Sequence, residues 1–238
     1  MRVRVAVGTS GYAYKEWKGT FYPEKLPQDQ MLRYYGEQFS TVEINNTFYR
    51  MPSEKVVLNW ASQVPDAFQF VLKASQRITH QKRLQDVGEE LGYFLKTSSA
   101  LGPKLGPTLF QLPPNFKKDV TRLEAFLALL PKRWRAAMEF RHASWLDDEV
   151  FAALRNHGVA LCGADTDEGE ASVVVTADWG YLRLRRAQYG EADLAGWAQR
   201  VLAQPWQEAF VFFKHEDAGT GPAFARQFMQ ALGRGETP

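Results

Sequence analysis

Residues 41–73, TVEINNTFYRMPSEKVVLNWASQVPDAFQFVLK, contain two short apolar stretches with a helical pattern between them. The stretches Thr41–Asn45 and Phe68–Lys73 have the length and the residue types of β-strands. Between them, Ser53 is predicted to cap a helix whose apolar side chains recur at helical spacing, namely Val56, Val57, Trp60 and Val64. Two strands joined by a helix predict a βαβ unit with parallel strands, and therefore an α/β fold.

The same alternation extends through the rest of the chain in both directions. Six further strands are predicted, at Val3–Gly8, Thr108–Leu112, Ala136–Phe140, Val159–Gly163, Tyr181–Arg185 and Phe210–Lys214. Helical patterns occupy Gln30–Phe39, Leu84–Ala100, Val120–Leu130, Asp148–Asn156, a segment with Leu194, Trp197 and Val201, and a last segment opened by Gly221 and Pro222. This order predicts a TIM-like (β/α)8 barrel that forms a single domain over residues 1–238, with a frayed tail at 233–238.

One connection departs from the pattern. Residues 164–179 have no helical stripe and include Val173–Val175 as a short extended piece. We therefore expect an irregular crossover in place of the helix between the sixth and seventh strands. The main alternative to a barrel is a doubly wound open sheet, which normally has a glycine-rich phosphate-binding turn after its first strand. The segment Gly8–Gly11 does not have that spacing, which favours the barrel.

The composition excludes several classes of protein. The 29 lysines and arginines nearly balance the 27 aspartates and glutamates, so the net charge of +2 gives no general signal for nucleic acid. Cys162 is the only cysteine, which rules out an intrachain disulfide and fits a reducing compartment. No apolar stretch could cross a bilayer, and the first residues lack the apolar run of a signal peptide. We expect a cytoplasmic protein that does not bind membranes.

Polar and charged residues stand near the ends of all eight predicted strands, where barrels collect their functional groups. Glu139 and Arg141 are two residues apart and share a face of their strand, as do Arg183 and Arg185. The candidate catalytic residues are Glu43, Glu139 and Asp165. The candidate substrate-binding residues are Thr9, Ser10, Tyr12, Asn45, Lys73, His80, Gln111, Arg141, His142, Arg183 and Arg185.

The charges of this set indicate the kind of ligand. The set contains three acids and five bases, and the bases are Lys73, Arg141, Arg183, Arg185 and Lys214. The sequence does not indicate whether the side chains of Lys214 and its neighbour His215 face the pocket. Because arginine binds phosphate and carboxylate through a planar fork of donors, the excess of bases favours a small anionic ligand. The first hypothesis is an enzyme acting on a phosphorylated or otherwise anionic sugar or nucleotide. Arg141, Arg183 and Lys73 would hold the anion, and Glu139, Glu43 or Asp165 would move a proton.

Other interpretations stay open. The same charges could form a structural ring of salt bridges that closes the barrel. Loops rich in tyrosine after the first two strands, with Tyr12, Tyr14 and Tyr49, suit a nucleic-acid-binding protein or a nuclease. A non-catalytic module that binds a metabolite is a third function. The sequence lacks HxH and HExxH spacings, so no zinc site is predicted, and the three acids leave only a weak Mg²⁺ or Mn²⁺ site.

Several segments carry a family resemblance. They are Gly8–Tyr12 with Trp17–Pro23, Val42–Arg50, Lys73 with Ile78–His80, Gln111–Pro114 and Glu139–Trp145. Together they resemble the YecE-like family, which is catalogued as a domain of unknown function. The resemblance implies a TIM-type barrel and no established activity. The chain differs from the family pattern at Arg183–Arg186, at Lys214–His215 and at Tyr12. The barrel type is also similar to sugar isomerases and to a DNA-repair endonuclease, which is an analogy of fold alone.

Overall fold

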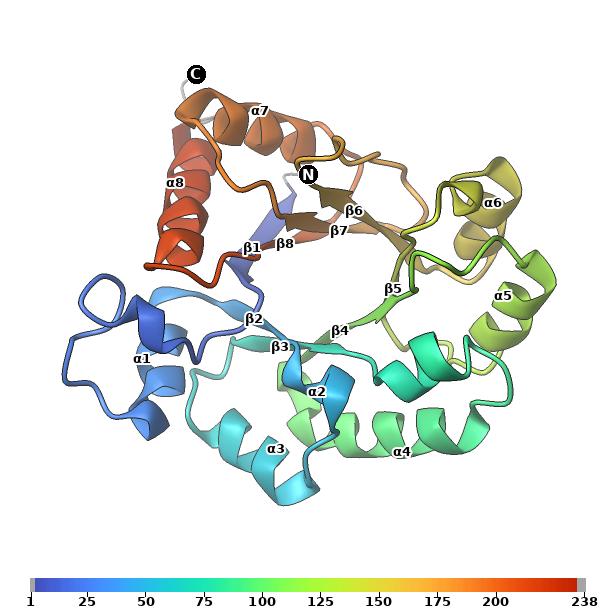
Figure 1. The fold of residues 1–238 in the computed structure, drawn as a ribbon, viewed down its shortest axis with the longest axis horizontal. Helices are drawn as coiled ribbons and strands as arrows, with labels where there is room; N and C mark the ends of the chain where they lie inside the picture. The colour runs from blue at the N-terminus through green and yellow to red at the C-terminus, as the bar shows by residue number, and fades with distance from the viewer. Residues whose placement is uncertain (1–2, 235–238) are drawn as a thin grey trace.

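The computed structural model describes residues 3–234, in which eight parallel strands form a ring surrounded by helices (Figure 1). The strands are β1 (Arg4–Thr9), β2 (Thr41–Ile44), β3 (Gln69–Lys73), β4 (Leu105–Gln111), β5 (Ala136–Glu139), β6 (Ala160–Asp165), β7 (Trp179–Leu184) and β8 (Glu208–Phe213). They are hydrogen-bonded in the order β1-β8-β7-β6-β5-β4-β3-β2. Sequential strands are neighbours throughout, so the predicted barrel is confirmed and the doubly wound sheet is excluded.

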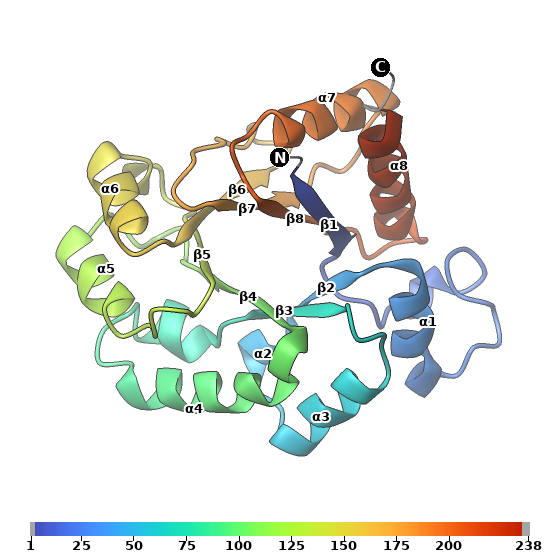
Figure 2. The same ribbon diagram turned by 180° about the vertical axis from the view of Figure 1, so that it is seen from behind.

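The helices cover the outside of the ring, as the view from behind also shows (Figure 2). The longer ones are α1 (Met31–Gln38), α3 (Glu54–Ser62), α4 (Gly88–Ser98), α5 (Val120–Leu127), α6 (Asp148–Asn156), α7 (Glu191–Leu202) and α8 (Thr220–Arg234). The short ones are α2 (Asn46–Tyr49), the 3₁₀ turns η1 (Lys15–Trp17), η2 (Gln28–Gln30), η4 (Ser99–Lys104) and η5 (Ala143–Trp145), and the π-helical turn η3 (Arg77–Gln81). Among residues 3–234, no helix is both long enough and apolar enough to span a membrane.

The connection between β6 and β7 confirms the predicted irregular crossover. Residues 166–178 contain no helix and no strand, only an isolated antiparallel bridge between Thr166 and Gly169. Val173–Val175, expected to be an extended piece, forms no ladder with a strand of the barrel. The crossover is nevertheless held against β6, because Thr176 Oγ1 accepts a hydrogen bond from the Leu161 amide at 2.7 Å.

Several local expectations need correction. Ser53 stands at the N-cap of α3, but its side chain makes no capping hydrogen bond, and Val56 is 41% exposed instead of buried. The helix predicted from Leu84 begins only at Gly88, because Leu84 has a left-handed backbone (φ 70°) that a helix cannot include. Helix α8 continues to Arg234, and residues 235–238 of the predicted frayed tail lie outside the described part of the chain.

The alternation of side chains along the strands divides the core in two. A cluster inside the barrel contains Val71, Leu109, Ala137, Ala160, Cys162, Trp179, Tyr181, Phe210 and Phe212. The other faces of the strands pack against the helices in a larger cluster. Cys162 belongs to the inner cluster, and burial raises the pKa of its thiol, which favours the unreactive protonated form. Because apolar side chains fill the middle of the barrel, polar sites can form only at its ends.

The barrel closes between β1 and β2 with few backbone hydrogen bonds. Ser10 and Glu43 form an isolated parallel bridge, and the Gly11 amide donates to the Glu43 carbonyl at 2.8 Å. A Cβ atom added to Gly8 would lie 2.1 Å from the carbonyl oxygen of Thr41. Glycine is therefore required where the two strands approach each other most closely.

A tyrosine hydroxyl completes this junction. Tyr35 OH, from α1, accepts a hydrogen bond from the Thr9 amide at 2.8 Å and donates to the Thr41 carbonyl at 3.1 Å. The single proton of the Thr9 hydroxyl has two acceptors within reach, the Gly11 carbonyl at 2.6 Å and Tyr35 OH at 2.9 Å. Thr9 was predicted to bind substrate, but its buried side chain points outward to the helix and joins the two strands instead.

Candidate functional site

The floor of the C-terminal barrel mouth is a buried arginine held between two glutamates. Arg183 Nη2 donates to Glu43 Oε1 at 2.8 Å, and Arg183 Nη1 donates to Glu139 Oε2 at 2.7 Å. The arginine side chain is 2% exposed and the two glutamates are 0% and 1% exposed. The three residues come from β7, β2 and β5, which all project these positions into the barrel interior. The sequence prediction that they converge at one end of the barrel therefore agrees with the structure.

Glu43 has both carboxylate oxygens occupied. Ser10 Oγ donates to Oε1 at 2.7 Å, and the Tyr181 hydroxyl donates to Oε2 at 2.6 Å. Burial acts to raise the pKa of Glu43, but the charge of Arg183 and these two hydrogen bonds outweigh it, so the pKa is lowered. Tyr181 was missed at the sequence level, although it is two residues before Arg183 and therefore shares its face of β7.

Glu139 is bound still more completely. Its Oε1 accepts from Gln111 Nε2 at 2.7 Å and from Arg141 Nε at 3.2 Å, and Arg185 Nη1 lies 3.9 Å away. Burial opposes ionisation, but Arg183, Arg141 and the Gln111 amide outweigh it and lower the pKa of Glu139 to about 2. Glu139 is therefore an anion at every ordinary pH. It is a weak base and cannot act as a general acid.

Further bases lie above this floor, closer to solvent. Lys73 Nζ, at the end of β3, donates to Gln111 Oε1 at 2.9 Å and lies 4.0 Å from the centre of the Phe48 ring. Burial lowers the pKa of Lys73 to about 8, and the charge of Arg183 adds to this effect. The attraction between an ammonium and a ring typically favours the charged form by about 0.5–1 kcal/mol. At Lys73, desolvation and repulsion by arginine are stronger.

Arg185 and Lys214 belong to the same group of cations. Burial lowers the pKa of Arg185, with a further contribution from Arg183. Burial also lowers the pKa of Lys214, with contributions from Arg185 and then Arg183. Lys214 therefore lies on the mouth side of β8, whereas the side chain of the next residue, His215, turns away and makes a 2.6 Å hydrogen bond with the Arg186 carbonyl. Counted with Arg141, the bases of the mouth outnumber the two glutamates.

A cavity of about 580 Å³ opens beside this group of charges. Glu139, Arg141 and Arg185 line it from the strand ends, and Asp167 and Glu168 line it from the crossover that follows β6. The Asp167 carboxylate accepts from the Ala187 amide at 3.1 Å, which fixes the crossover against the end of β7. These two acids were not predicted as site residues, and no sequence pattern marks them, because an irregular segment has no preferred face.

Asp165, the third predicted acid, does not join Glu43 and Glu139. It is three residues from the inward-facing Cys162, so the alternation of β6 turns it to the outer face of the sheet. There Arg186 Nε and Nη2 bind its two carboxylate oxygens at 2.9 and 3.0 Å, and the Tyr189 hydroxyl donates to Oδ2 at 2.9 Å. Its prediction as a residue of the mouth is corrected, and the same geometry removes the third ligand from the suggested Mg²⁺ or Mn²⁺ site. Within residues 3–234, no three His, Cys, Asp or Glu side chains are grouped so that they could hold a metal.

The two histidines predicted for the site have different surroundings. His80, on η3, is hydrogen-bonded to Thr79 Oγ1 at 2.9 Å, and its ring meets the Phe48 ring edge-on at 4.9 Å. Burial lowers the pKa of His80, and Lys73 and then Arg141 add to the effect, so His80 borders the mouth. His142 instead caps η5, because its Nδ1 accepts from the Ser144 amide at 3.1 Å.

Tyr12 and Asn45 lie at a separate small hollow of about 100 Å³, which Tyr14 and Trp60 also line. The Asn45 Nδ2 atom is buried there without a hydrogen-bond partner among the described residues. The rings of Trp17, Phe21 and Tyr22 fill the base of the first loop, are almost fully buried and join the outer core cluster. Tyr49 is 73% exposed and packs against Phe48 alone among the described rings.

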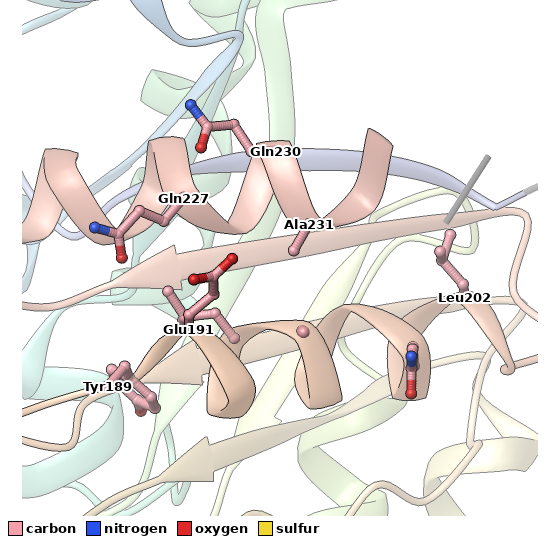
Figure 3. Close-up of a pocket in the computed structure, with 9 residues that line it drawn as sticks. Tyr189, Glu191, Leu202, Gln227, Gln230 and Ala231 are labelled. Atoms are coloured by element: carbon pink, nitrogen blue, oxygen red, sulfur yellow. The ribbon is translucent and has the colours of Figure 1, made fainter. Parts of the chain in front are cut away.

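A further hollow, of about 510 Å³, lies outside the barrel between α7 and α8. Figure 3 shows Gln227, Gln230 and Ala231 on α8 and Glu191 and Leu202 on α7, which are among the residues that line it. None of the residues predicted for the site lines this hollow. The charged mouth is therefore the place where the predicted residues and an open cavity coincide.

The fold and this mouth define a TIM-type barrel with a polar, charged site at its strand ends. The chain belongs to the family described as "Protein of unknown function DUF72", whose model matches residues 6–238. This confirms the YecE-like resemblance, and the family description assigns no activity.

Individual relatives and solved structures agree with the family. The chain is 36% identical to the UPF0759 protein YecE of Escherichia coli K12 over 135 residues, which are 56% of this chain and 50% of YecE, so the match spans about half of that relative. It is 25% identical to the UPF0759 protein YunF of Bacillus subtilis, covering 96% of this chain and 94% of YunF. A solved DUF72 family protein of Thermotoga maritima has a TM-score of 0.85 and 30% identity, covering 97% of this chain and 99% of that one. One from Enterococcus faecalis has a TM-score of 0.82 at 20% identity, covering 96% and 95%, and supports the fold alone.

Proposed function

We propose that this protein binds a small anionic molecule at the C-terminal mouth and acts on it, the ligand being a phosphorylated or otherwise anionic sugar or nucleotide. One observation carries the proposal. Arg183 and Arg141 together balance the charges of Glu43 and Glu139, yet the further bases Lys73, Arg185 and Lys214 stand within the same mouth. Bases that depress one another's pKa values are stabilised by an anion that enters among them.

Arg141 and Arg185 are the groups that would bind the anion, because both line the open cavity. Their planar guanidinium groups suit the oxygens of a phosphate or a carboxylate. Arg183 is too deeply buried and too fully paired to contact a ligand directly. Its role, and that of the glutamates beside it, is to hold the floor of the site in one arrangement.

Proton transfer by Glu43 or Glu139, which the sequence suggests, requires a carboxyl group whose pKa is near neutrality. Both pKa values are lowered instead, that of Glu139 to about 2. Lys73 and His80 are better suited, because burial and nearby cations bring the pKa of Lys73 down to about 8. We assign Glu43 and Glu139 as positioning residues and place any acid–base step at these two side chains.

The alternative of a nucleic-acid-binding protein is less well supported. A nucleic acid strand needs a continuous basic track, whereas Asp167 and Glu168 line the same cavity as the arginines. A non-catalytic metabolite-binding module would use the same mouth and would differ only in leaving its ligand unchanged.

The test is a panel of inorganic phosphate, sugar phosphates and nucleotides against the uncharged sugars, read by thermal shift and calorimetry. We expect stabilisation by phosphorylated compounds only. A lost charged hydrogen bond typically costs about 1.5–3 kcal/mol, so Arg141→Ala and Arg185→Ala should each weaken binding roughly 10- to 100-fold. Arg226→Ala is the matched control, since Arg226 lies on α8 and donates to Gln38. Binding that survives both mouth variants, or no binding by any anion, contradicts the proposal.

A further inference from the structure

We propose that Lys73 is a nucleophilic lysine, which forms an imine with an aldehyde or ketone group of the anionic ligand. This inference deepens the function proposed above and rests on the same mouth. It assigns the class of substrate more narrowly, as an anionic carbonyl compound, and it gives Lys73 a covalent role in place of the anion-holding role expected from the sequence.

The contacts of Lys73 are unusual for a half-buried lysine. Among residues 3–234 it forms no ion pair with a carboxylate, and its Nζ donates to the neutral side-chain oxygen of Gln111 at 2.9 Å. The glutamates of the mouth form their ion pairs with Arg183 instead, at 2.8 Å for Glu43 and 2.7 Å for Glu139. The amine therefore has no partner that would fix its positive charge.

The groups that surround the amine disfavour the ammonium form. Phe48 covers one side at 4.0 Å and, although its ring attracts the ammonium, contributes to the burial of the amine. The charged and titratable groups that face it are Glu43 from β2, His80 from η3, Glu139 and Arg141 from β5, and Arg183 from β7. The glutamates favour the ammonium, but burial and the two arginines prevail, and the pKa falls to about 8. A lysine that is desolvated and placed beside other cations is the usual form of a nucleophilic lysine.

A second half-buried lysine shows the opposite arrangement. Lys104 Nζ donates to the carbonyls of Ala61 and Val64, each at 2.8 Å, and lies 3.4 Å from the Asp66 carboxylate. Three oxygens surround its amine, so all of its donors are occupied. Burial alone therefore does not make a lysine reactive in this protein, and Lys104 is the internal control for Lys73.

The reaction balances without any further cofactor. The neutral Nζ attacks the carbonyl carbon, a C–N bond forms, and both amine protons leave with the carbonyl oxygen as one water molecule. Hydride from borohydride then adds to the imine carbon and a solvent proton to the nitrogen, which leaves a stable secondary amine for detection. The anionic group of the ligand would meanwhile rest on Arg141 and Arg185, which line the adjoining cavity.

Pyridoxal 5′-phosphate, which carries both an aldehyde and a phosphate, is a suitable probe, and benzaldehyde is its uncharged counterpart. The full-length protein is treated with a limiting amount of each at pH 7, reduced with borohydride and mapped by mass spectrometry. We expect Lys73 to be modified at least about tenfold faster than Lys104 and the exposed Lys96. We also expect the phosphorylated probe to be preferred, and the rate at Lys73 to rise with pH through about pH 8. Lys73→Arg keeps the charge and should abolish the adduct.

The outcomes separate this inference from the proposed function. Equal modification of Lys73 and Lys104, or an undiminished adduct in Lys73→Arg, overturns the nucleophilic role. Phosphate binding by calorimetry with no Lys73 adduct from either aldehyde leaves the proposed function standing and removes only this inference. Rapid modification of Lys73 by both aldehydes, with no preference for the phosphorylated one, supports the nucleophile and counts against the anion site.

Discussion

The two ends of the barrel both contain a buried carboxylate paired with arginine, but they are built in opposite ways. At the C-terminal mouth one arginine, Arg183, is shared by Glu43 and Glu139 and is 2% exposed. At the other end one carboxylate, Glu208, is shared by Arg4 at 2.6 Å and Arg135 at 2.8 Å, whose side chains are 75% and 33% exposed. In the first case the arginine is enclosed, and in the second it reaches water.

This difference distinguishes the candidate site at the C-terminal mouth from the ion pairs that cover the other end of the barrel. The guanidinium of Arg135 lies 4.6 Å from the Trp179 ring centre and 5.1 Å from that of Phe210, so it caps the apolar filling of the barrel. Its charge needs no ligand because solvent already reaches it. At the mouth, Arg183 has no such access, whereas the additional bases Arg141 and Arg185 are 34% and 21% exposed and line the cavity. The same residue types thus pair near solvent at one end of the barrel and form the buried floor of the candidate site at the other.

The largest expected effect is that of Arg183→Met. It removes the shared partner of two fully buried carboxylates, and removing one member of a buried ion pair typically costs about 3–5 kcal/mol. Urea denaturation at pH 7 would measure this loss in the free energy of unfolding. A loss below about 1 kcal/mol would mean that the glutamates find other partners and that the mouth is not the enclosed site described here.

The second-largest effect is expected from acid, which should lower the free energy of unfolding by protonating a glutamate of the mouth. The pKa of Glu139 is about 2 in the folded protein against 4.5 for an unperturbed glutamate, so its contribution is complete above pH 4.5 and is lost as the pH falls towards 2. The amount is on the order of 3 kcal/mol. Urea unfolding between pH 2 and 6 would follow it, and Glu139→Gln should flatten the curve. An equally steep curve in Glu139→Gln would assign the acid sensitivity to other groups.

Replacing the two half-buried lysines should have opposite effects at pH 7. The pKa of Lys73 is lowered from 10.5 to about 8, so stability rises between pH 8 and 10.5, and below pH 8 the charged lysine opposes folding. Lys73→Met should therefore raise the free energy of unfolding by about 1 kcal/mol, since the side chain is partly exposed and its charge partly screened. Lys104→Met should lower it by about 1–2 kcal/mol, through lost hydrogen bonds. Thermal and urea unfolding would measure both variants. If both substitutions changed the free energy of unfolding in the same direction, the predicted contrast between Lys73 and Lys104 would be contradicted.

The smallest effect is expected at the other end of the barrel. Arg4→Met removes a mostly exposed partner of Glu208, and Arg135 still binds the remaining carboxylate oxygen. Exposed ion pairs contribute about 0–1 kcal/mol, so the change in unfolding free energy should stay within that range. A loss as large as that of Arg183→Met would show that the two ends are energetically alike, and the distinction between them would fail.

The amino-acid sequence by itself determined the strand positions and much of the mouth. Alternation of two residues along each strand is a local property, and it was enough to place Glu139 with Arg141 and Arg183 with Arg185. The same rule, applied to β7, would have found Tyr181. The excess of basic over acidic residues at the strand ends was also readable, because barrels bring all eight ends to one face.

Only the tertiary structure decided which face of each strand is the inner one and which residues pair. Asp165 looked equivalent to Glu139 from its position at a strand end, yet it lies on the outer face of β6 and binds Arg186. Arg183 reaches glutamates that are 140 and 44 residues away along the chain. Such pairs depend on how far neighbouring strands are shifted relative to one another when the barrel closes. The position of the crossover, residues 166–178, depends on the same strands. Both are properties of the closed sheet as a whole, and no local pattern encodes them.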